Sequence, residues 1–201
     1  MNIRVFRLIR NYFEKNEENY PNLWEEADKL TESRLLEKHI NDAIDDTGEI
    51  RDNATKDLQN IRRSIHDKSA RLRSRLQKIL RKVSDEEMVM EEFVTLREGR
   101  FVLPVKSEHK KHLPGIIHGL SQTGSTVFIE PSEIIETNNE LSLLFNEEKR
   151  EMYRILSNLT SEIGEKSSGF LSSMEIMGHL DSIIARGKYA LEYGGVKPEI
   201  L

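Results

Sequence analysis

Residues 54–83, ATKDLQNIRRSIHDKSARLRSRLQKILRKV, decide how the rest of this 201-residue chain must fold. Apolar side chains recur along them in steps of three and four residues, with one step of seven near Lys68–Ser69. This spacing places them on one face of a helix, which for thirty residues extends about 45 Å. An apolar seam of that length predicts a second long helix packed against it. The seam consists of Leu58, Ile61, Ile65, Leu72, Leu76, Ile79 and Val83.

The partner helix is predicted further along the chain. Apolar residues follow helical spacing again between Leu141 and Ile163, and Thr137–Glu140 has the T-x-x-E pattern of a capping box. A small β unit of about 40 residues is expected between the two helices. The shortest way to bury both seams is antiparallel pairing, so the two helices are expected to form a stalk that carries the intervening segment at its tip.

The intervening segment has strand periodicity. FVTLREGRFVLPVK, residues 93–106, predicts two strands joined by a Glu98–Gly99 turn, in which Pro104 favours an edge position or a bulge. A second pair of strands is predicted around Gly124. The predicted fold class is therefore mainly α with a small β insertion, a long antiparallel helical stalk that carries a small β tip.

The other helices complete the predicted organisation. A helix over 4–17 and another from Asn22 to a break at 45–53 precede the stalk, and the last helix stops at Gly194-Gly195. The expected parts are an N-terminal helical part over 1–52, an outgoing long helix over 53–87, the β tip over 88–131, a returning long helix over 132–166 and a C-terminal helix over 167–201.

Composition limits the classes of protein to consider. Charged residues make up 32% and the hydrophobic set 37%, which is too polar for a compact α/β enzyme and suits exposed helices with narrow apolar stripes. There is no cysteine, so the chain has no disulfide framework. It also has no run of about 18 apolar residues and no signal peptide pattern. We expect a cytoplasmic protein without a membrane partner.

Local positive charge is the main functional signal, because the net charge of the whole chain is -5. Residues 56–82 hold ten Lys or Arg against two Asp. This run indicates either a solvated face that pairs with acidic residues of the returning helix, such as Glu147, Glu148 and Glu151, or a surface that follows a nucleic-acid backbone. The β tip adds further cations, which we predict as nucleic-acid-binding residues: Arg97, Arg100, Lys106, Lys110 and Lys111.

No catalytic, metal or cofactor residue is assigned. GLSQTGST, Gly119–Thr126, is one residue short of a phosphate-binding loop, but Ser125 replaces the lysine and a strand pattern, not a helix, follows. A glycine-containing turn is the better interpretation. His109, His112 and His118 lie within ten residues of one another, yet no cysteine or acidic partner at ligand spacing supports zinc.

Three strings resemble the bacterial MutS-two family, a paralogue group of MutS. They are VTLREGRFVLPVKSE (94–108), GIIHGLSQTGSTVFIEPSEIIETNNEL (115–141) and ARGKYALEYGGVKPEI (185–200). AIDDTGEIRDNATKDLQNIRRSI (43–65) fits as well, so the resemblance is strong from about 39 to 201, while residues 1–38 match only in helical character. One departure is Leu96, where the family more often has Ile before the arginine.

The resemblance implies a fold and an activity for a larger protein. This stretch would be the core or lever with a reduced clamp, carried by two long helices. The full proteins are dimeric ATPases that use ATP and Mg, and usually carry an Smr nuclease domain. They are associated with suppression of recombination through branched DNA, or with rescue of stalled ribosomes, rather than with standard mismatch repair.

Two functions stay open for this chain, which we interpret as a fragment without the ATPase and nuclease parts. The first is a lever and clamp that contacts the backbone of branched or duplex DNA, or of ribosomal RNA, without sequence specificity. The second is a module for protein–protein interaction, dimerisation or ribosome docking on a helical spacer. Enzymatic activity is expected of the parent protein, as ATPase and endonuclease, and not of these 201 residues.

Overall fold

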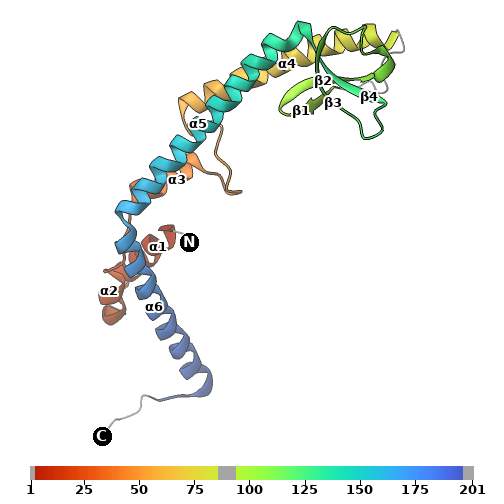
Figure 1. Ribbon diagram of the computed structural model, residues 1–201. Helices are drawn as coiled ribbons and strands as arrows, with labels where there is room; N and C mark the ends of the chain where they lie inside the picture. The colour runs from red at the N-terminus through yellow and green to blue at the C-terminus, as the bar shows by residue number, and fades with distance from the viewer. Residues whose placement is uncertain (1–2, 86–93, 197–201) are drawn as a thin grey trace. The chain divides into compact units, whose positions relative to one another are not determined.

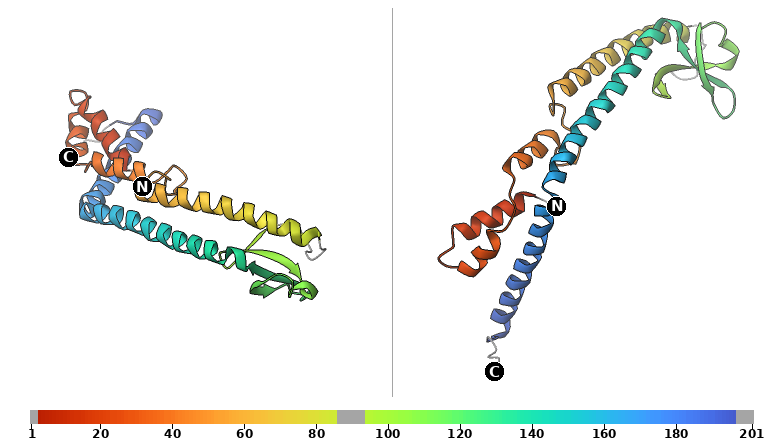
Figure 2. Two further views of the ribbon diagram at one scale, coloured as in Figure 1. Left: turned by 90° about the horizontal axis from the view of Figure 1, so that it is seen from above. Right: turned by 60° about the vertical axis from the view of Figure 1, so that its left-hand side comes forward.

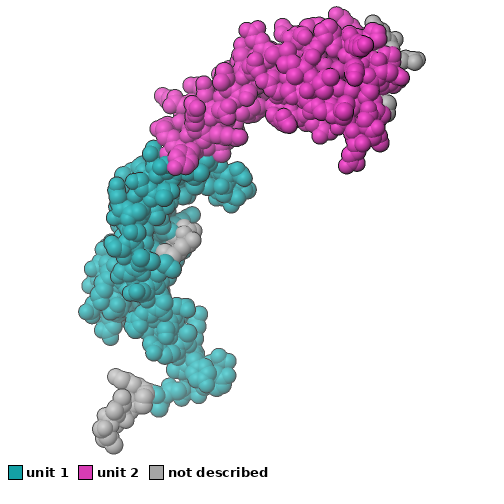
Figure 3. Space-filling model, viewed as in Figure 1, with its two compact units in different colours: residues 1–51, 155–201 teal, residues 52–154 magenta. Residues whose placement is uncertain are grey.

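The computed structural model describes residues 3–85 and 94–196 and divides the chain into two compact units. Unit 1 consists of residues 1–51 and 155–201, and unit 2 of residues 52–154 (Figure 3). The predicted boundary between 87 and 88, and the strand residue Phe93, lie outside the described residues. The described part is mainly helical with one small antiparallel sheet, which confirms the predicted fold class at this level (Figure 1).

Unit 1 is built from helices around an aromatic core. It contains α1 (Ile3–Glu14), α2 (Pro21–Ala27), α3 (Arg34–Ala43), α6 (Ser167–Tyr193) and the end of α5 (Ile135–Glu165). Arg7 on α1 forms a two-pronged ion pair with Glu37 on α3, with both N–O distances at 2.8 Å. The buried core residues are Phe6, Phe13, Ala27, Leu30, Leu36, Phe170 and Leu180.

The single helix predicted from Asn22 to the break at 45–53 is wrong, because it is interrupted between α2 and α3. The backbone N–H of Thr31, inside the interruption, donates to the Ser173 hydroxyl of α6 at 2.8 Å. Gly169 allows this approach, since a Cβ there would lie 2.7 Å from the Thr31 hydroxyl oxygen. The interruption is therefore fixed by a contact distant in sequence, which helical periodicity does not reveal.

The one tryptophan of the chain lies in unit 1. Trp24 is partly buried against the aromatic core, and the Arg10 guanidinium lies 5.8 Å from the centroid of its ring. Arg10 also donates to the Asp28 carboxylate at 2.6 Å. The cation and the ring thus hold α1 against α2.

Unit 2 contains the antiparallel helix pair. Arg62 of α4 (Lys56–Asp85) donates to Glu148 of α5 at 2.8 Å, and Lys68 pairs with Glu140. Partner numbers fall on α5 as they rise on α4, so the two helices run in opposite directions (Figure 2). The predicted antiparallel pairing is therefore confirmed for these parts of α4 and α5.

The outer half of the α4 seam has a different partner from the one predicted. Its apolar side chains share one core with the sheet, so they do not pair with α5 along their whole length. Alternate residues of a strand point to one face, and this apolar face of the sheet needs a cover that α4 provides. The core consists of Leu72, Leu76, Ile79, Leu80 and Val83 of α4 with Phe101, Leu103, Val105, Val127, Ile129, Ile134 and Leu141.

The sheet has four antiparallel strands in the order β1-β2-β4-β3. They are β1 (Thr95–Arg97), β2 (Arg100–Lys106), β3 (Gly115–Leu120) and β4 (Thr126–Pro131). Glu98 and Gly99 both have positive φ, 50° and 76°, and form the predicted two-residue turn. β1 pairs with β2 only as far as Val102, so Pro104 has a described strand neighbour on one side alone. The register of β1 would place Phe93 opposite Pro104, and Phe93 lies outside the described residues, so the edge or bulge position of Pro104 stays a prediction.

The predicted capping box at Thr137–Glu140 is wrong. A short 3-10 helix, η2 (Ser132–Ile134), leads directly into α5, which begins at Ile135. Thr137 therefore lies within the helix and not at its N-cap. The next residue, Asn138, uses its side chain to bind the sheet.

Candidate nucleic-acid interface

The five predicted cations do not form one cluster. Arg97 and Arg100 lie at one end of β2 and Lys106 at the other, about 20 Å away for seven strand residues. Lys110 and Lys111 follow η1 (Ser107–His109) in the segment between β2 and β3, and both are exposed. The sheet thus presents positive charge at two ends.

Arg97 is exposed but ordered by an aromatic ring. Its guanidinium lies 4.1 Å from the centroid of the Phe128 ring on β4. A cation over a ring face keeps its charge, and its N–H groups remain available for a further acceptor. Arg97 is therefore preorganised to meet an anion.

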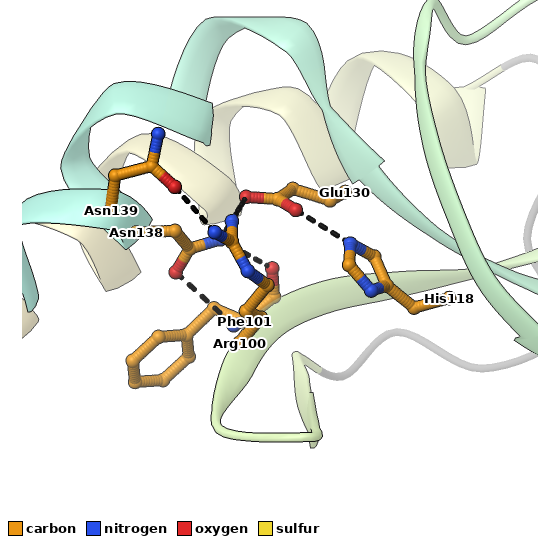
Figure 4. Close-up of polar contacts among 6 residues, drawn as sticks. All are labelled: Arg100, Phe101, His118, Glu130, Asn138 and Asn139. Atoms are coloured by element: carbon orange, nitrogen blue, oxygen red, sulfur yellow. Dashed lines mark hydrogen bonds and ion pairs between the residues drawn. The ribbon is translucent and has the colours of Figure 1, made fainter. Parts of the chain in front are cut away.

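Arg100 is held by hydrogen bonds within unit 2, as Figure 4 shows. Its Nη1 donates to Oε1 of Glu130 at 2.6 Å, and its Nη2 donates to Oδ1 of Asn139. Glu130 is completely buried, whereas Arg100 is half-buried. A buried carboxylate needs a charged partner, so Arg100 is committed to Glu130.

Glu130 collects donors from three other elements of unit 2. Its Oε1 also accepts from Nδ2 of Asn138 on α5 at 2.8 Å, and its Oε2 lies 2.6 Å from Nε2 of His118 on β3 (Figure 4). With Arg100 from β2, both carboxylate oxygens are satisfied. This Glu130 network joins β2, β3, β4 and α5, and it gives His118 a structural role as a hydrogen-bond partner of Glu130.

Asn138 extends the network to the backbone of β2. Its Nδ2 donates to the Phe101 carbonyl at 3.1 Å, and its Oδ1 accepts from the Phe101 N–H at 3.2 Å (Figure 4). The pairing of β2 with β4 begins at Leu103, so β4 offers no partner to Phe101. The Asn138 amide binds the Phe101 backbone as a further residue of β4 would. It thereby satisfies buried peptide groups that would otherwise lack partners. Sequence reasoning missed Glu130 and Asn138, whose only signal was their place in the family-like strings.

The Gly119–Thr126 stretch consists of the end of β3, the loop 121–125 and the start of β4, in agreement with the predicted glycine-containing turn. The N–H of Ser121 donates to the Thr126 carbonyl at 2.9 Å, and Gly124 has φ of 72°. β4 follows directly, so no helix N-terminus faces a phosphate here. These residues do not fit ATP, and no group of three or more His, Asp or Glu within the described ranges could hold a metal ion.

The basic run of α4 is only partly neutralised by α5. Burial acts to lower the pKa of Arg62, but its hydrogen bonds with Glu148 and Asp52 outweigh this and raise the pKa. Glu151, by contrast, accepts from Arg154 at 2.6 and 2.7 Å and from Thr55, which lower its pKa. The ion-pairing interpretation is thus confirmed for Arg62 with Glu148, whereas Glu151 pairs within its own helix.

Comparison with known proteins decides the family. Endonuclease MutS2 of Pelotomaculum thermopropionicum is 41% identical over 184 residues, which is 92% of this chain and 23% of that protein. Endonuclease MutS2 of Clostridioides difficile is 38% identical over 98% of this chain, and that of a Geobacillus species 36% identical over 98%. This segment belongs to the MutS2 family. No protein-family model matches the chain.

The match has a clear extent. The chain spans about a quarter of the length of the curated MutS2 relatives it matches. Coverage of 98% takes in nearly all of residues 1–38, where we had expected only helical character to be shared. No helix within the described ranges is both long and apolar enough to span a membrane.

Proposed function

We propose that this chain is the lever and clamp segment of a MutS2-type DNA-binding protein, and that unit 2 contacts the sugar–phosphate backbone without reading base sequence. One observation carries the proposal. Arg97, Lys110 and Lys111 are exposed, Lys106 is half-exposed, and none of the four forms an ion pair with any described residue. Unpaired cations on a fixed sheet are suited to phosphate contacts, which position a protein on nucleic acid but carry no sequence information.

The Glu130 network supports this assignment. It fixes the sheet to α5 through buried charged hydrogen bonds, so the exposed cations are displayed from a rigid base. Arg100 serves that base and is left out of the proposed contact set. Because the net charge of the chain is -5, attraction to a polyanion depends on these local charges.

The activity of the whole protein is proposed on the strength of the relatives' names and the resemblance. We infer an endonuclease that also hydrolyses ATP with Mg, acts as a homodimer in the cytoplasm, and handles branched or duplex DNA or stalled ribosomes. ATP does not fit the Gly119–Thr126 loop, so no step of that chemistry is assigned to the described residues.

Fluorescence anisotropy with labelled branched and linear duplexes tests the backbone contact. We expect binding that weakens steeply between 50 and 200 mM salt, because released counterions drive it. Lys110→Glu with Lys111→Glu should lower the affinity by about tenfold or more and flatten the salt slope by about two. The matched control, Arg186→Glu with Lys188→Glu on exposed α6 positions of unit 1, should have a much smaller effect. Affinity that does not change with salt, or equal losses in both variants, would contradict the proposal.

A second candidate function is protein docking through β3. This strand is at an edge of the sheet, and its Ile116, Ile117 and Leu120 side chains are 47%, 53% and 63% exposed. An apolar edge strand offers unpaired backbone groups to another chain. Under this alternative, Ile117→Lys would weaken self-association or partner affinity in sedimentation experiments, while the lysine reversals would leave nucleic-acid binding unchanged.

A further inference from the structure

A basic groove on α4 is the strongest feature that the sheet cations do not explain. It has a volume of about 480 Å³ and is open to solvent along the helix pair of unit 2. Its cations recur on α4 in steps of three, four and three residues, which places them on one helix face beside the apolar seam. The lining residues are Lys68, Arg71, Leu72, Ser74, Arg75 and Lys78 of α4 with Thr137 and Glu140 of α5.

The charges in this α4 groove are unbalanced. Glu140 is the one carboxylate in the described lining, and it pairs with Lys68. Arg75 only approaches the Glu133 carbonyl, at 3.5 Å. Arg71 and Lys78 form no ion pair with any described residue and are exposed. Three cations therefore remain available to an anionic ligand, in contrast with Arg62 nearer the start of the same helix.

The shape and chemistry favour an extended polyanion. The four cations span ten residues of helix, about 15 Å, so they would meet several successive phosphates of a strand. The lining holds no aromatic side chain for base stacking and no amide for reading base edges. Ser74 and Thr137 add hydroxyl donors, which also suit phosphate oxygens.

We infer that the α4 groove is a second binding site for the sugar–phosphate backbone of nucleic acid. It is formed by Lys68, Arg71, Arg75 and Lys78, and is distinct from the cations of the sheet. The inference rests on the proposed function in taking nucleic acid as the ligand. It does not depend on any contact by Arg97, Lys106, Lys110 or Lys111.

Charge removal within one helix tests the groove. Arg71→Gln with Lys78→Gln should lower affinity for a labelled 20-base-pair duplex about tenfold and reduce the salt slope by about two. The control is Arg63→Gln with Arg81→Gln, which removes two exposed cations of α4 outside the groove and should change affinity by no more than about twofold. Circular dichroism checks that all variants keep their helix content. Equal losses in both double variants would overturn the inference, since only overall charge would then matter.

A gain of affinity provides a second test. Glu140→Gln removes the lining carboxylate and frees Lys68, so we expect binding to tighten severalfold and the salt slope to steepen by about one. Glu147→Gln is the control, because Glu147 is exposed on the same helix and does not line the groove. If Glu140→Gln leaves binding unchanged or weakens it, while Glu147→Gln behaves like the unmodified chain, the inference is contradicted.

Failure of the groove and failure of the sheet contact are distinguishable. If only the Arg71 and Lys78 variant binds more weakly, the groove stands and the proposed sheet contact fails. If only the Lys110 and Lys111 variant does, the sheet contact stands and the groove is overturned. Preference for an acidic peptide over a duplex would overturn the choice of nucleic acid.

Discussion

At the residue scale, Asn138 and Glu130 decide how the sheet is attached to α5. One amide pairs both backbone groups of Phe101 and also donates to the buried carboxylate. Buried polar groups are expensive unless every hydrogen bond is made, so the network has little tolerance for the loss of a member.

Asn138→Ala is predicted to destabilise unit 2. The change leaves the N–H and C=O of Phe101 unpaired, at a cost of about 1–3 kcal/mol for each buried group. Asn139→Ala is the matched control, because Asn139 is exposed and contributes one contact to Arg100. Urea unfolding followed by circular dichroism measures both, and a control as unstable as Asn138→Ala would contradict this role.

Residue roles of this kind were the least predictable from sequence. The charges of Arg97 and Arg100 look equivalent along the chain, yet one stacks on Phe128 and the other neutralises Glu130. Their difference arises from β4, about thirty residues away, and no local pattern carries that information. The turn residues Glu98 and Gly99 were predictable because the chemistry of a two-residue hairpin is local.

At the element scale, close packing between neighbouring strands depends on a missing side chain. A Cβ at Gly115 would lie 2.1 Å from the Glu130 carbonyl oxygen and 2.8 Å from Cγ2 of Ile129. Both obstacles belong to β4, the partner strand, and the nearer one is backbone. The start of β3 can therefore pair with the end of β4 only with glycine at this position.

Gly115→Ala and Gly187→Ala are predicted to have opposite effects on stability. The first forces β3 away from β4. It should lower the free energy of unfolding by about 1–3 kcal/mol or more, the typical cost of an overpacked site. The second adds a methyl group in open space within α6 and should stabilise the helix by about 0.5–1 kcal/mol. Thermal unfolding measures both changes, and a Gly115→Ala protein as stable as the unmodified chain would contradict the predicted clash.

The sequence predicted the long helices and both strand pairs because their periodicities are strong. It did not predict which element covers the outer half of α4, since an apolar seam fits either a helix or a sheet face. The T-x-x-E pattern failed because Pro131 and a 3-10 turn start the helix earlier. For the α4 groove, the sequence showed only a basic run. It did not indicate which cations of that run remain unpaired.

At the scale of the whole molecule, each unit has its own apolar core and its own ion pairs. Carboxyl groups in both units have pKa values below their ordinary range. The main causes are hydrogen bonds from Lys29 to Glu26, from Arg7 to Glu37, from Thr47 to Asp45 and from Arg154 to Glu151. The folded state therefore binds protons less readily than the unfolded chain at these four groups.

Stability is predicted to fall in acid. A lowered pKa in the folded state stabilises the fold fully above the ordinary value, 4.5 for Glu and 3.8 for Asp, and this stabilisation is lost as the pH drops through the folded pKa. Urea midpoints should be level from pH 7 to about 5 and decrease below about 4.5. Glu37→Gln should make the decrease shallower, whereas Glu14→Gln, which removes an exposed carboxylate with only a weak charge interaction with Arg10, should change it much less. A midpoint that rises in acid would contradict the assignment.

The stacking of Arg10 on Trp24 has a practical consequence. This indole is the chain's single tryptophan, and the aromatic residues of 52–154 include only one tyrosine, Tyr153. Excitation at long wavelength therefore selects light emitted from the N-terminal helical core alone. Trp24 is therefore an intrinsic fluorescent probe of unit 1, and changes at the sheet of unit 2 need an attached fluorophore to be followed in this way.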